Sequence, residues 1–287
     1  MKTFTKRLSP TYGLLALIAA LVATSLLAGQ ASSLPDAPQS VRTAAHAAPP
    51  KPTVVLVHGA WADSSGWAKV TRGLQAAGYQ VLAPPTPLRG LRQDSDYLAS
   101  FLRDRTTGPV VLVGHSYGGA VITNAARSDR DVKALVYVNA FVPDKGDSIL
   151  GMLDPDHQLD PADLFDFVGY PNAPDGDVDL YLKQAVFPAA IANGVPPRVA
   201  AAMATAQRPV TLSALTAGSR APAWKTVPSF YLLGTEDHIV PPRLQRSMAE
   251  RAGARITSVD AGHLPMITDA DAVEALIVKA ARATRAR

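Results

Sequence analysis

The sequence contains no cysteine among its 287 residues. This absence excludes disulfide bridges, thiolate metal ligands and a cysteine nucleophile. It leaves the compartment open, because a chain of this length can bury enough apolar surface to be stable outside the cell without bridges. The hydrophobic fraction of 47% is sufficient for a large core.

Charged residues are also scarce, at 18% of the chain against about 25% in an average soluble domain. The formal net charge of +4 comes from the two ends, which contain no acidic residue. Their basic residues are Lys2, Lys6, Arg7, Arg282, Arg285 and Arg287. The rest of the chain is slightly acidic, so it has no basic stripe of the kind that nucleic-acid binding needs. We therefore expect no nucleic-acid partner.

The N-terminus has the composition of a secretory signal peptide. Basic residues precede an apolar run over residues 13–29, and Gly29-Gln30-Ala31 fits a small-x-small cleavage site. Lys6-Arg7 is not a twin arginine, which favours general secretion. We expect residues 1–31 to be removed and the protein to be secreted, extracellular or in the cell envelope, with no stable membrane insertion. A retained membrane anchor is the alternative, but the run is short for a membrane span.

Residues 32–52 are rich in alanine, proline and serine and indicate a disordered linker. Beyond them, apolar runs rich in β-branched residues alternate with helical segments. The runs are hydrophobic throughout, which is typical of strands buried on both faces. We expect strands at Thr53–Val57, Gln80–Ala83, Val110–Val113, Ala134–Val138, Ser229–Leu233 and Arg255–Val259. We expect helices at Trp67–Ala77, Ser95–Arg105, Tyr117–Arg127, Arg243–Ala252 and Ala270–Ala283.

This alternation predicts an α/β fold, with a doubly wound, mostly parallel sheet of about six core strands. The interval between Val138 and Ser229 breaks the rhythm and is too long for an unstructured loop. Its second half contains three expected helical segments: Leu180–Asn193, Arg198–Gln207 and Val210–Ala217. We therefore predict one catalytic domain over residues 53–287, with a helical cap inserted at about 144–224.

A G-x-S-x-G sequence lies between an expected strand and an expected helix, where Val113 is followed by Gly114-His115-Ser116-Tyr117-Gly118. A nucleophilic serine must stand on a tight, strained turn that projects its Oγ above the sheet. The glycines are needed because a Cβ there would collide with the neighbouring strand and helix. In this context the pattern predicts that Ser116 is a nucleophile, whereas a bare pentapeptide would indicate only a glycine-rich turn.

The first expected strand ends in His58-Gly59-Ala60-Trp61, which suits an oxyanion loop. The oxyanion hole would use the backbone N–H groups of Ala60 and Tyr117. His58 is a tempting base, but we expect it to be structural and to bond loop backbone, because in this architecture the histidine comes last in chain order.

The acid and the base should follow late strands. Asp237 follows the strand that ends near Leu233, and we assign it as the acid, with Glu236 and Asp260 as rivals. His263 follows the last expected strand in a glycine-containing loop, and we assign it as the base. The order serine, acid, histidine is more specific than any of its members alone.

Taken together, His58–Trp61, Gly114–Gly119, Gly234–Asp237 and Gly262-His263 resemble the α/β-hydrolase superfamily, over about residues 53–283. These motifs are similar to those of small bacterial esterases related to plant salicylate-methylester esterases and hydroxynitrile lyases. The resemblance implies the triad and oxyanion residues assigned above, and no cofactor. One position departs from the lyase branch, which has a lysine directly after its catalytic histidine, where this chain has Leu264.

Trp61 and Trp67 either bind substrate as walls of the acyl pocket or only pack the oxyanion loop. Asp175, Asp177 and Asp179 are spaced as in a calcium loop, but the glycine required after Asp179 is absent and Val186 stands at the twelfth position, so we expect a solvated loop of the cap. Asp154, Asp156 and His157 combine one histidine with loop acids, which is typical of a surface loop, so we expect no metal site.

The sequence thus predicts a secreted serine hydrolase that cleaves small to medium apolar carboxylic esters. The partner we expect is a small-molecule ester. The alternatives are other chemistry of the same triad (perhydrolysis, acyl transfer, C–C hydrolysis or a lyase reaction) and a non-catalytic hydrolase-like binding protein. The ester is preferred on the family resemblance, since one fold hosts many reactions.

Overall fold

The structure is a computed structural model, and it describes residues 50–153 and 160–285. The described residues belong to one compact unit, Ala48–Arg287. The expected signal peptide, most of the expected linker, and the group Asp154, Asp156 and His157 lie outside the described residues. Within the described ranges, no helix has the length and apolar character needed to cross a membrane.

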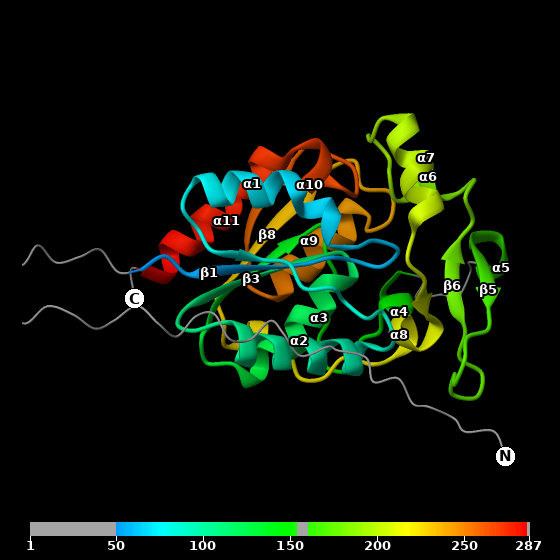
Figure 1. Cartoon of the computed structure of the whole chain (residues 1–287), viewed down its shortest axis with the longest axis horizontal. Coiled ribbons are helices and arrows are strands. Elements are labelled where there is room, and N and C mark those ends of the chain that lie inside the picture. The colour runs from blue at the N-terminus through cyan, green and yellow to red at the C-terminus, as the bar shows by residue number, and fades with distance from the viewer. Residues whose placement is uncertain (1–49, 154–159, 286–287) are drawn as a thin grey trace, which may run out of the picture. The chain divides into compact units, whose positions relative to one another are not determined.

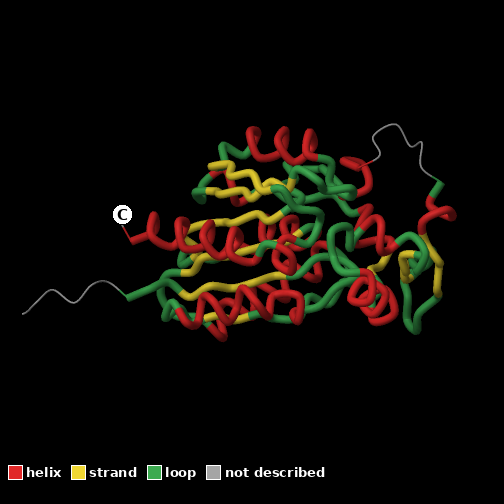
Figure 2. Tube along the Cα trace, turned by 90° about the horizontal axis from the view of Figure 1, so that it is seen from above, coloured by secondary structure: helices red, strands yellow, loops and turns green. Residues whose placement is uncertain are grey.

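The main sheet has six strands, and every neighbouring pair is parallel. Figure 2 shows these strands side by side, with the strands of the cap beyond one end of them. The predicted parallel, doubly wound sheet is therefore confirmed. In spatial order the strands are β2 (Val81–Leu82), β1 (Thr53–Val57), β3 (Val110–His115), β4 (Val132–Val138), β8 (Ser229–Gly234) and β9 (Arg255–Val259).

Helices cover both faces of this sheet (Figure 1). On one face α1 (Ala68–Ala76) packs against α11 (Ala270–Arg285), and on the other α2 (Leu91–Arg105) packs against α3 (Tyr117–Ala125). Helix α1 illustrates why these helices pack on the sheet, because it buries Val70 and Leu74, which lie one turn apart on a single helix face. The remaining helices of the α/β core are η1 (Ser64–Trp67), η2 (Ala126–Ser128), α9 (Pro242–Arg251) and α10 (Pro265–Thr268).

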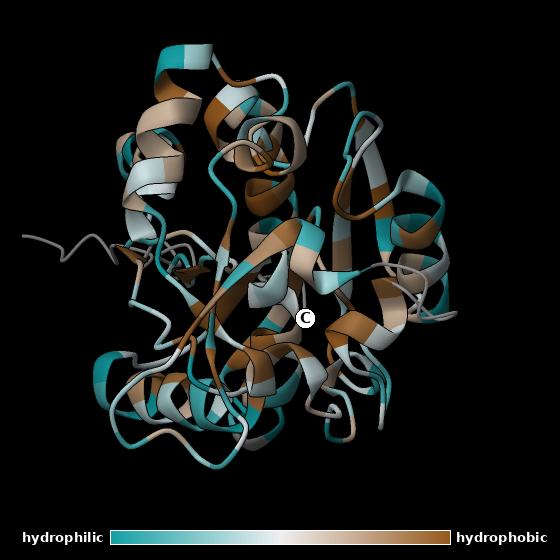
Figure 3. Ribbon diagram, turned by 90° about the vertical axis from the view of Figure 1, so that its right-hand side faces the viewer, coloured by the Kyte–Doolittle hydropathy of each residue, from teal (hydrophilic) through white to brown (hydrophobic). Residues whose placement is uncertain are grey.

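The hydrophobic core lies between these layers. Every residue of β1, β3 and β8 is buried, which accounts for their continuous apolar sequences. Figure 3 shows hydrophobic residues concentrated on the central strands, whereas helices at the periphery carry hydrophobic and hydrophilic residues side by side. This layering fixes the carboxyl ends of β1, β3, β8 and β9 at one edge of the sheet, where ligands bind in folds of this kind.

The long insertion between β4 and β8 contains more than helices. Its helices are α4 (Ile149–Leu153), α5 (Pro161–Leu164), α6 (Phe187–Ala190), α7 (Pro197–Ala206), α8 (Leu212–Thr216) and η3 (Ala223–Lys225). It also holds an antiparallel sheet of β5 (Phe165–Val168), β6 (Asp179–Leu182) and β7 (Val210–Thr211).

The expectation of a purely helical cap is therefore wrong in two segments. Leu180–Asn193 forms a strand followed by a short helix, and Val210–Ala217 begins as a strand. Strand β6 pairs with residues far away in the chain, and helical periodicity within a short window cannot reveal such pairing.

The cap is joined to loops of the main sheet by specific bonds. Trp61 donates from Nε1 to Leu180 O over 2.9 Å, and Arg89 pairs with Asp179. Asp177, the middle member of the calcium-like acidic group, accepts hydrogen bonds from Tyr170 and Ser213. The carboxylates of Asp177 and Asp179 therefore have partners within the protein itself.

Candidate active site

Ser116 occupies the turn between β3 and α3. Its backbone has φ 51° and ψ −125°, a left-handed conformation that costs energy for any residue with a Cβ. The flanking glycines are required as expected. A Cβ on Gly114 would lie 2.5 Å from Gly118 O, and one on Gly118 would lie 2.6 Å from Val57 O. The structure therefore contains the strained strand–turn–helix that the sequence predicted around Ser116.

Asp237 and His263 meet at the same edge of the sheet. Asp237 follows β8, His263 follows β9, and Nδ1 of His263 lies 2.9 Å from Oδ2 of Asp237. The side chain of His263 is 1% exposed and that of Asp237 is 0% exposed. Because Asp237 Oδ2 accepts from Nδ1, the neutral imidazole keeps its proton there and leaves Nε2 as an acceptor. A buried pair of this geometry can take up a proton from a neighbouring hydroxyl.

The rivals of Asp237 lie elsewhere. Glu236 and Asp260 are both exposed, and Asp260 accepts a hydrogen bond from Thr235 Oγ1 at 3.0 Å. Among the ion pairs of the described residues, His263 pairs with Asp237 and with neither of the two rival acids.

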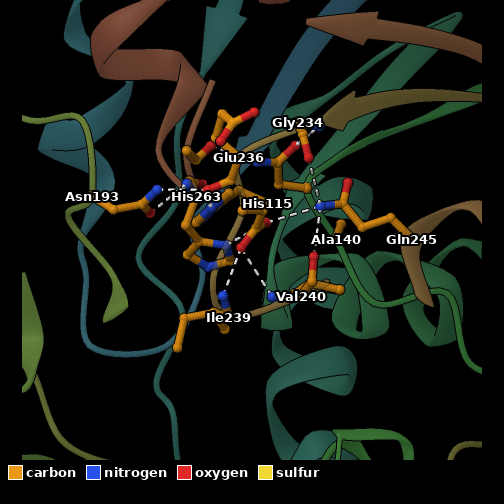
Figure 4. A network of polar contacts seen from close by, with 12 residues as sticks. His115, Ala140, Asn193, Gly234, Glu236, Ile239, Val240, Gln245 and His263 are labelled. Carbon is orange, nitrogen blue, oxygen red and sulfur yellow. Dashed lines mark hydrogen bonds and ion pairs between the residues drawn. The ribbon is translucent and has the colours of Figure 1, made fainter. Parts of the chain in front are cut away.

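The carboxylate of Asp237 is fully hydrogen-bonded. Its Oδ1 accepts the backbone N–H groups of Ile239 at 2.8 Å and Val240 at 2.9 Å. Its Oδ2 accepts Nε2 of Gln245 at 3.0 Å in addition to His263. Gln245 is wholly buried on α9, and Figure 4 shows its amide reaching this network. These donors fix the carboxylate in one orientation.

The expected oxyanion donors lie beside Ser116. Tyr117 is the first residue of α3, so its N–H has no acceptor one turn earlier within the helix. A Cβ on Gly59 would lie 2.8 Å from Ser116 Cβ, which brings the loop that carries Ala60 against the serine. Tyr117 is anchored through its hydroxyl, which donates to buried Asp94 Oδ2 at 2.7 Å. Burial raises the pKa of the Asp94 carboxyl, and the hydrogen bond from Tyr117 opposes that rise.

The two other histidines near the site are structural. His58 donates from Nδ1 to Gly59 O at 2.8 Å and accepts from Thr86 N at 2.9 Å, so both its nitrogens are used by backbone, as expected. His115 donates from Nε2 to His263 O at 2.8 Å. Burial lowers the pKa of His58 to about 4, and burial, followed by the charge of His263, lowers the pKa of His115 well below its ordinary value.

These lowered pKa values predict a stability that falls in mild acid. Between its ordinary pKa of 6.5 and about 4, the unfolded chain binds a proton that folded His58 does not. The free energy of unfolding should therefore decrease as pH falls through this window, by up to about 1.4 kcal/mol per pH unit for each such histidine. Urea unfolding at pH 7, 6 and 5 measures this. His58→Gln should flatten the slope, and an unchanged slope would contradict the prediction.

A cavity of about 340 Å³ lies next to these residues. His115 and Leu264, which are adjacent in sequence to Ser116 and His263, line it. α7 of the cap contributes Val199, Met203 and Ala206, which share one helix face. Its size is that of a pocket for a small ligand.

The two tryptophans both line this cavity. Trp61 stacks on Phe165 of β5 with ring centroids 5.6 Å apart, and Trp67 meets the ring of His115 edge-on at 6.4 Å. Trp61 therefore packs against the cap and Trp67 against the residue before Ser116, while both rings also line the cavity.

Several residues of the site escaped the sequence analysis: Asp94, Asn139, Asn193 and Gln245. Each hydrogen-bonds a residue in or next to the site, and none belongs to a recognisable motif. A buried polar residue among apolar ones is a weak signal, which Asp94 and Gln245 give within their amphipathic helices.

Comparison with known proteins agrees with this geometry. Residues 54–276 match the model of the alpha/beta hydrolase family. The chain belongs to the alpha/beta hydrolase family. The resemblance found in the sequence is therefore confirmed.

Among curated relatives, carbendazim hydrolyzing esterase of Nocardioides sp. (strain SG-4G) is 34% identical over 179 residues, covering 55% of this chain and 73% of that protein. Methyl jasmonate esterase 1 of Vitis vinifera is 35% identical over 102 residues, covering 31% of this chain and 39% of that protein. With such relatives, this member of the alpha/beta hydrolase family is an enzyme of the carboxylesterase type.

Solved structures share the fold. Polyneuridine aldehyde esterase superposes with a TM-score of 0.68 at 22% identity, covering 80% of this chain and 99% of that one. An extracellular alpha/beta-hydrolase from a Paenibacillus species gives a TM-score of 0.65 at 22% identity, covering 80% and 98%. At these identities the likeness shows the alpha/beta hydrolase fold alone.

Proposed function

We propose that this protein hydrolyses small to medium apolar carboxylic esters through an acyl-enzyme on Ser116, with His263 as base and Asp237 as acid. The observation that carries the proposal is the buried 2.9 Å contact between His263 Nδ1 and Asp237 Oδ2 at the sheet edge where Ser116 stands on its strained turn. A histidine that a carboxylate holds in one tautomer, at the same sheet edge as a serine on a strained turn, suits nucleophilic catalysis.

The reaction has two steps. His263 Nε2 takes the proton of Ser116 Oγ as the oxygen attacks the ester carbonyl, and the imidazolium then protonates the departing alcohol. In the second step water attacks the acyl-enzyme as His263 takes its proton; the imidazolium then returns that proton to Ser116 Oγ as the acyl C–O bond breaks, and the carboxylic acid leaves. The N–H groups of Ala60 and Tyr117 stabilise the negative oxygen of each tetrahedral intermediate.

The cavity supports an apolar substrate group. Trp67, Met203 and Leu264 are among its lining residues, and an apolar lining favours a group that gains by leaving water. Asp63 and Lys69 also line it, but each has a protein partner: Asp63 accepts from Ser65 N, and Lys69 donates to Ile267 O. We propose that the cavity receives the apolar acyl or alcohol part of the ester.

A panel of p-nitrophenyl esters tests this function. Wild-type enzyme should cleave the acetate, butyrate and hexanoate, and kcat/KM should fall for chains too long for a cavity of about 340 Å³. Met203→Trp should fill the cavity and lower kcat/KM for the hexanoate at least tenfold, with the acetate changed less than about threefold. Thr205→Trp, exposed on the same helix, is the matched control. Equal losses for both esters would count against the cavity as the substrate site.

An assay with mandelonitrile beside the esters distinguishes a lyase reaction from ester hydrolysis. A hydroxynitrile lyase must stabilise departing cyanide, and the lyase branch has a lysine after its histidine for this purpose. Here Leu264 occupies that position and is 3% exposed, which disfavours a free anion. Rapid cyanide release from mandelonitrile with negligible ester cleavage would refute the esterase proposal.

We also propose that the protein is secreted, on the basic, apolar and small-residue order of its first 31 residues. Mass spectrometry of protein from the culture medium should find a mature N-terminus between about Ala28 and the alanine- and proline-rich linker. Full-length protein retained in the membrane would overturn this proposal.

A further inference from the structure

Asn193 connects the cap to both loops that carry the acid and the base. It follows α6 of the cap, and its Nδ2 donates to Glu236 O at 2.6 Å, one residue before Asp237. Its Oδ1 accepts the backbone N–H of His263 at 3.2 Å. Figure 4 shows Asn193 beside His263, on the side opposite to Gln245. One amide side chain therefore spans the two loops.

Asn193 also lies in close contact with the loop that carries the proposed base, His263. A Cβ on Gly262 would lie 2.3 Å from Asn193 O and 2.5 Å from its Nδ2. No real Cβ approaches backbone so closely, so glycine is required directly before His263 because the cap residue rests on it. The glycine of the Gly262-His263 pair thus has a physical reason that lies in the cap.

A second asparagine bridges the same two loops from the core. Asn139, fully buried at the end of β4, accepts from Gly234 N at 2.8 Å and donates to Gly262 O at 2.7 Å. The core side of this bridge is fixed by the sheet, whereas Asn193 belongs to the cap. His238 adds a second link to the cap, since its Nδ1 lies 3.1 Å from Ala189 O of α6.

We infer that Asn193 is a positioning residue, which makes the alignment of His263 with Asp237 depend on the seating of the cap. The inference rests on the proposed function and deepens it. A small displacement of the imidazole reduces turnover steeply, because proton transfer needs hydrogen-bond geometry at both nitrogens. Asn193 touches no substrate in this scheme, so its loss should lower kcat more than it raises KM.

The test compares Asn193→Ala with Gln207→Ala in the full-length enzyme. Gln207 is a matched cap amide: its side chain bonds Leu182 N at 2.9 Å and Leu182 O at 2.8 Å, and reaches neither triad loop. With p-nitrophenyl acetate, Asn193→Ala should lose about tenfold in kcat with KM changed less than about threefold, whereas Gln207→Ala should keep kcat. Asn193→Asp, which retains the acceptor for His263 N, should fall between wild type and Asn193→Ala.

Amide hydrogen exchange measures the hydrogen bond between His263 N and Asn193 Oδ1 independently of enzyme activity. Exchange at the His263 N–H should quicken about tenfold in Asn193→Ala and stay at the wild-type rate in Gln207→Ala. A wild-type kcat in Asn193→Ala, a change confined to KM, or an equal kcat loss in Gln207→Ala would overturn the inference alone. A wild-type enzyme that cleaves no ester would overturn the proposed function, and the catalytic role of Asn193 with it.

Discussion

Ser116→Ala should abolish ester hydrolysis, with kcat falling at least about 10⁴-fold, while the protein stays folded. The loss follows from removing the only atom that can form the acyl-enzyme in the proposed mechanism. The fold should persist because alanine, like serine, carries a Cβ, so the left-handed backbone at φ 51° is no more strained than before. Hydrolysis of p-nitrophenyl butyrate and a thermal unfolding curve measure the two effects.

A fluorophosphonate probe supplies the control. Wild-type protein should be labelled and Ser116→Ala should not, since only a serine activated by a base reacts quickly. Ser65→Ala, a change at a different serine, which lines the cavity, should leave labelling and activity intact. Activity within tenfold of wild type in folded Ser116→Ala would contradict the assignment, and an unlabelled wild type would favour a non-catalytic binding protein.

Asp237→Asn should lower kcat at least about 10³-fold, for a reason visible in its hydrogen bonds. The N–H groups of Ile239 and Val240 require an oxygen at one position, so the new amide nitrogen must face His263 and Gln245. His263 would then have to accept at Nδ1 and carry its proton on Nε2. That tautomer cannot take the proton of Ser116.

The rival acids are the matched controls for this change. Glu236→Gln and Asp260→Asn alter exposed carboxylates that do not contact His263, and each should retain kcat within about threefold. The measurement is kcat for p-nitrophenyl acetate at a fixed pH, with the unfolding midpoint recorded for each variant. If Asp260→Asn is the crippling change, Asp237 is not the acid.

The fold was predictable because its strands are buried on both faces. Val54–Val57 and Val110–Val113 are apolar at every position, and a run of that kind between helical segments admits few alternatives to a parallel sheet. The turn at Ser116 was predictable for a related reason. Its glycines are demanded by backbone atoms a few ångströms away, so a steric requirement appears directly in the residue pattern.

The cap was harder to predict. β6 is four residues long and pairs with β5 and β7, so its structure depends on contacts that lie outside any local window. Its Asp179 pairs with Arg89, and Trp61 of the oxyanion loop donates to Leu180. Polar residues that looked like a solvated loop in the sequence therefore join the cap to the core.

The sequence by itself determined the sheet, the strained turn at Ser116 and the chain order of the candidate triad, because each of these depends on local sterics or on the burial of a continuous segment. Only the tertiary structure decided which carboxylate reaches His263 and which amides hold the two catalytic loops. Chain order favoured Asp237 but left Glu236 and Asp260 as rivals, and Asn139, Asn193 and Gln245 carry no motif. Their roles come from hydrogen bonds between different elements and loops, which exist only once the sheet, its helices and the cap have packed.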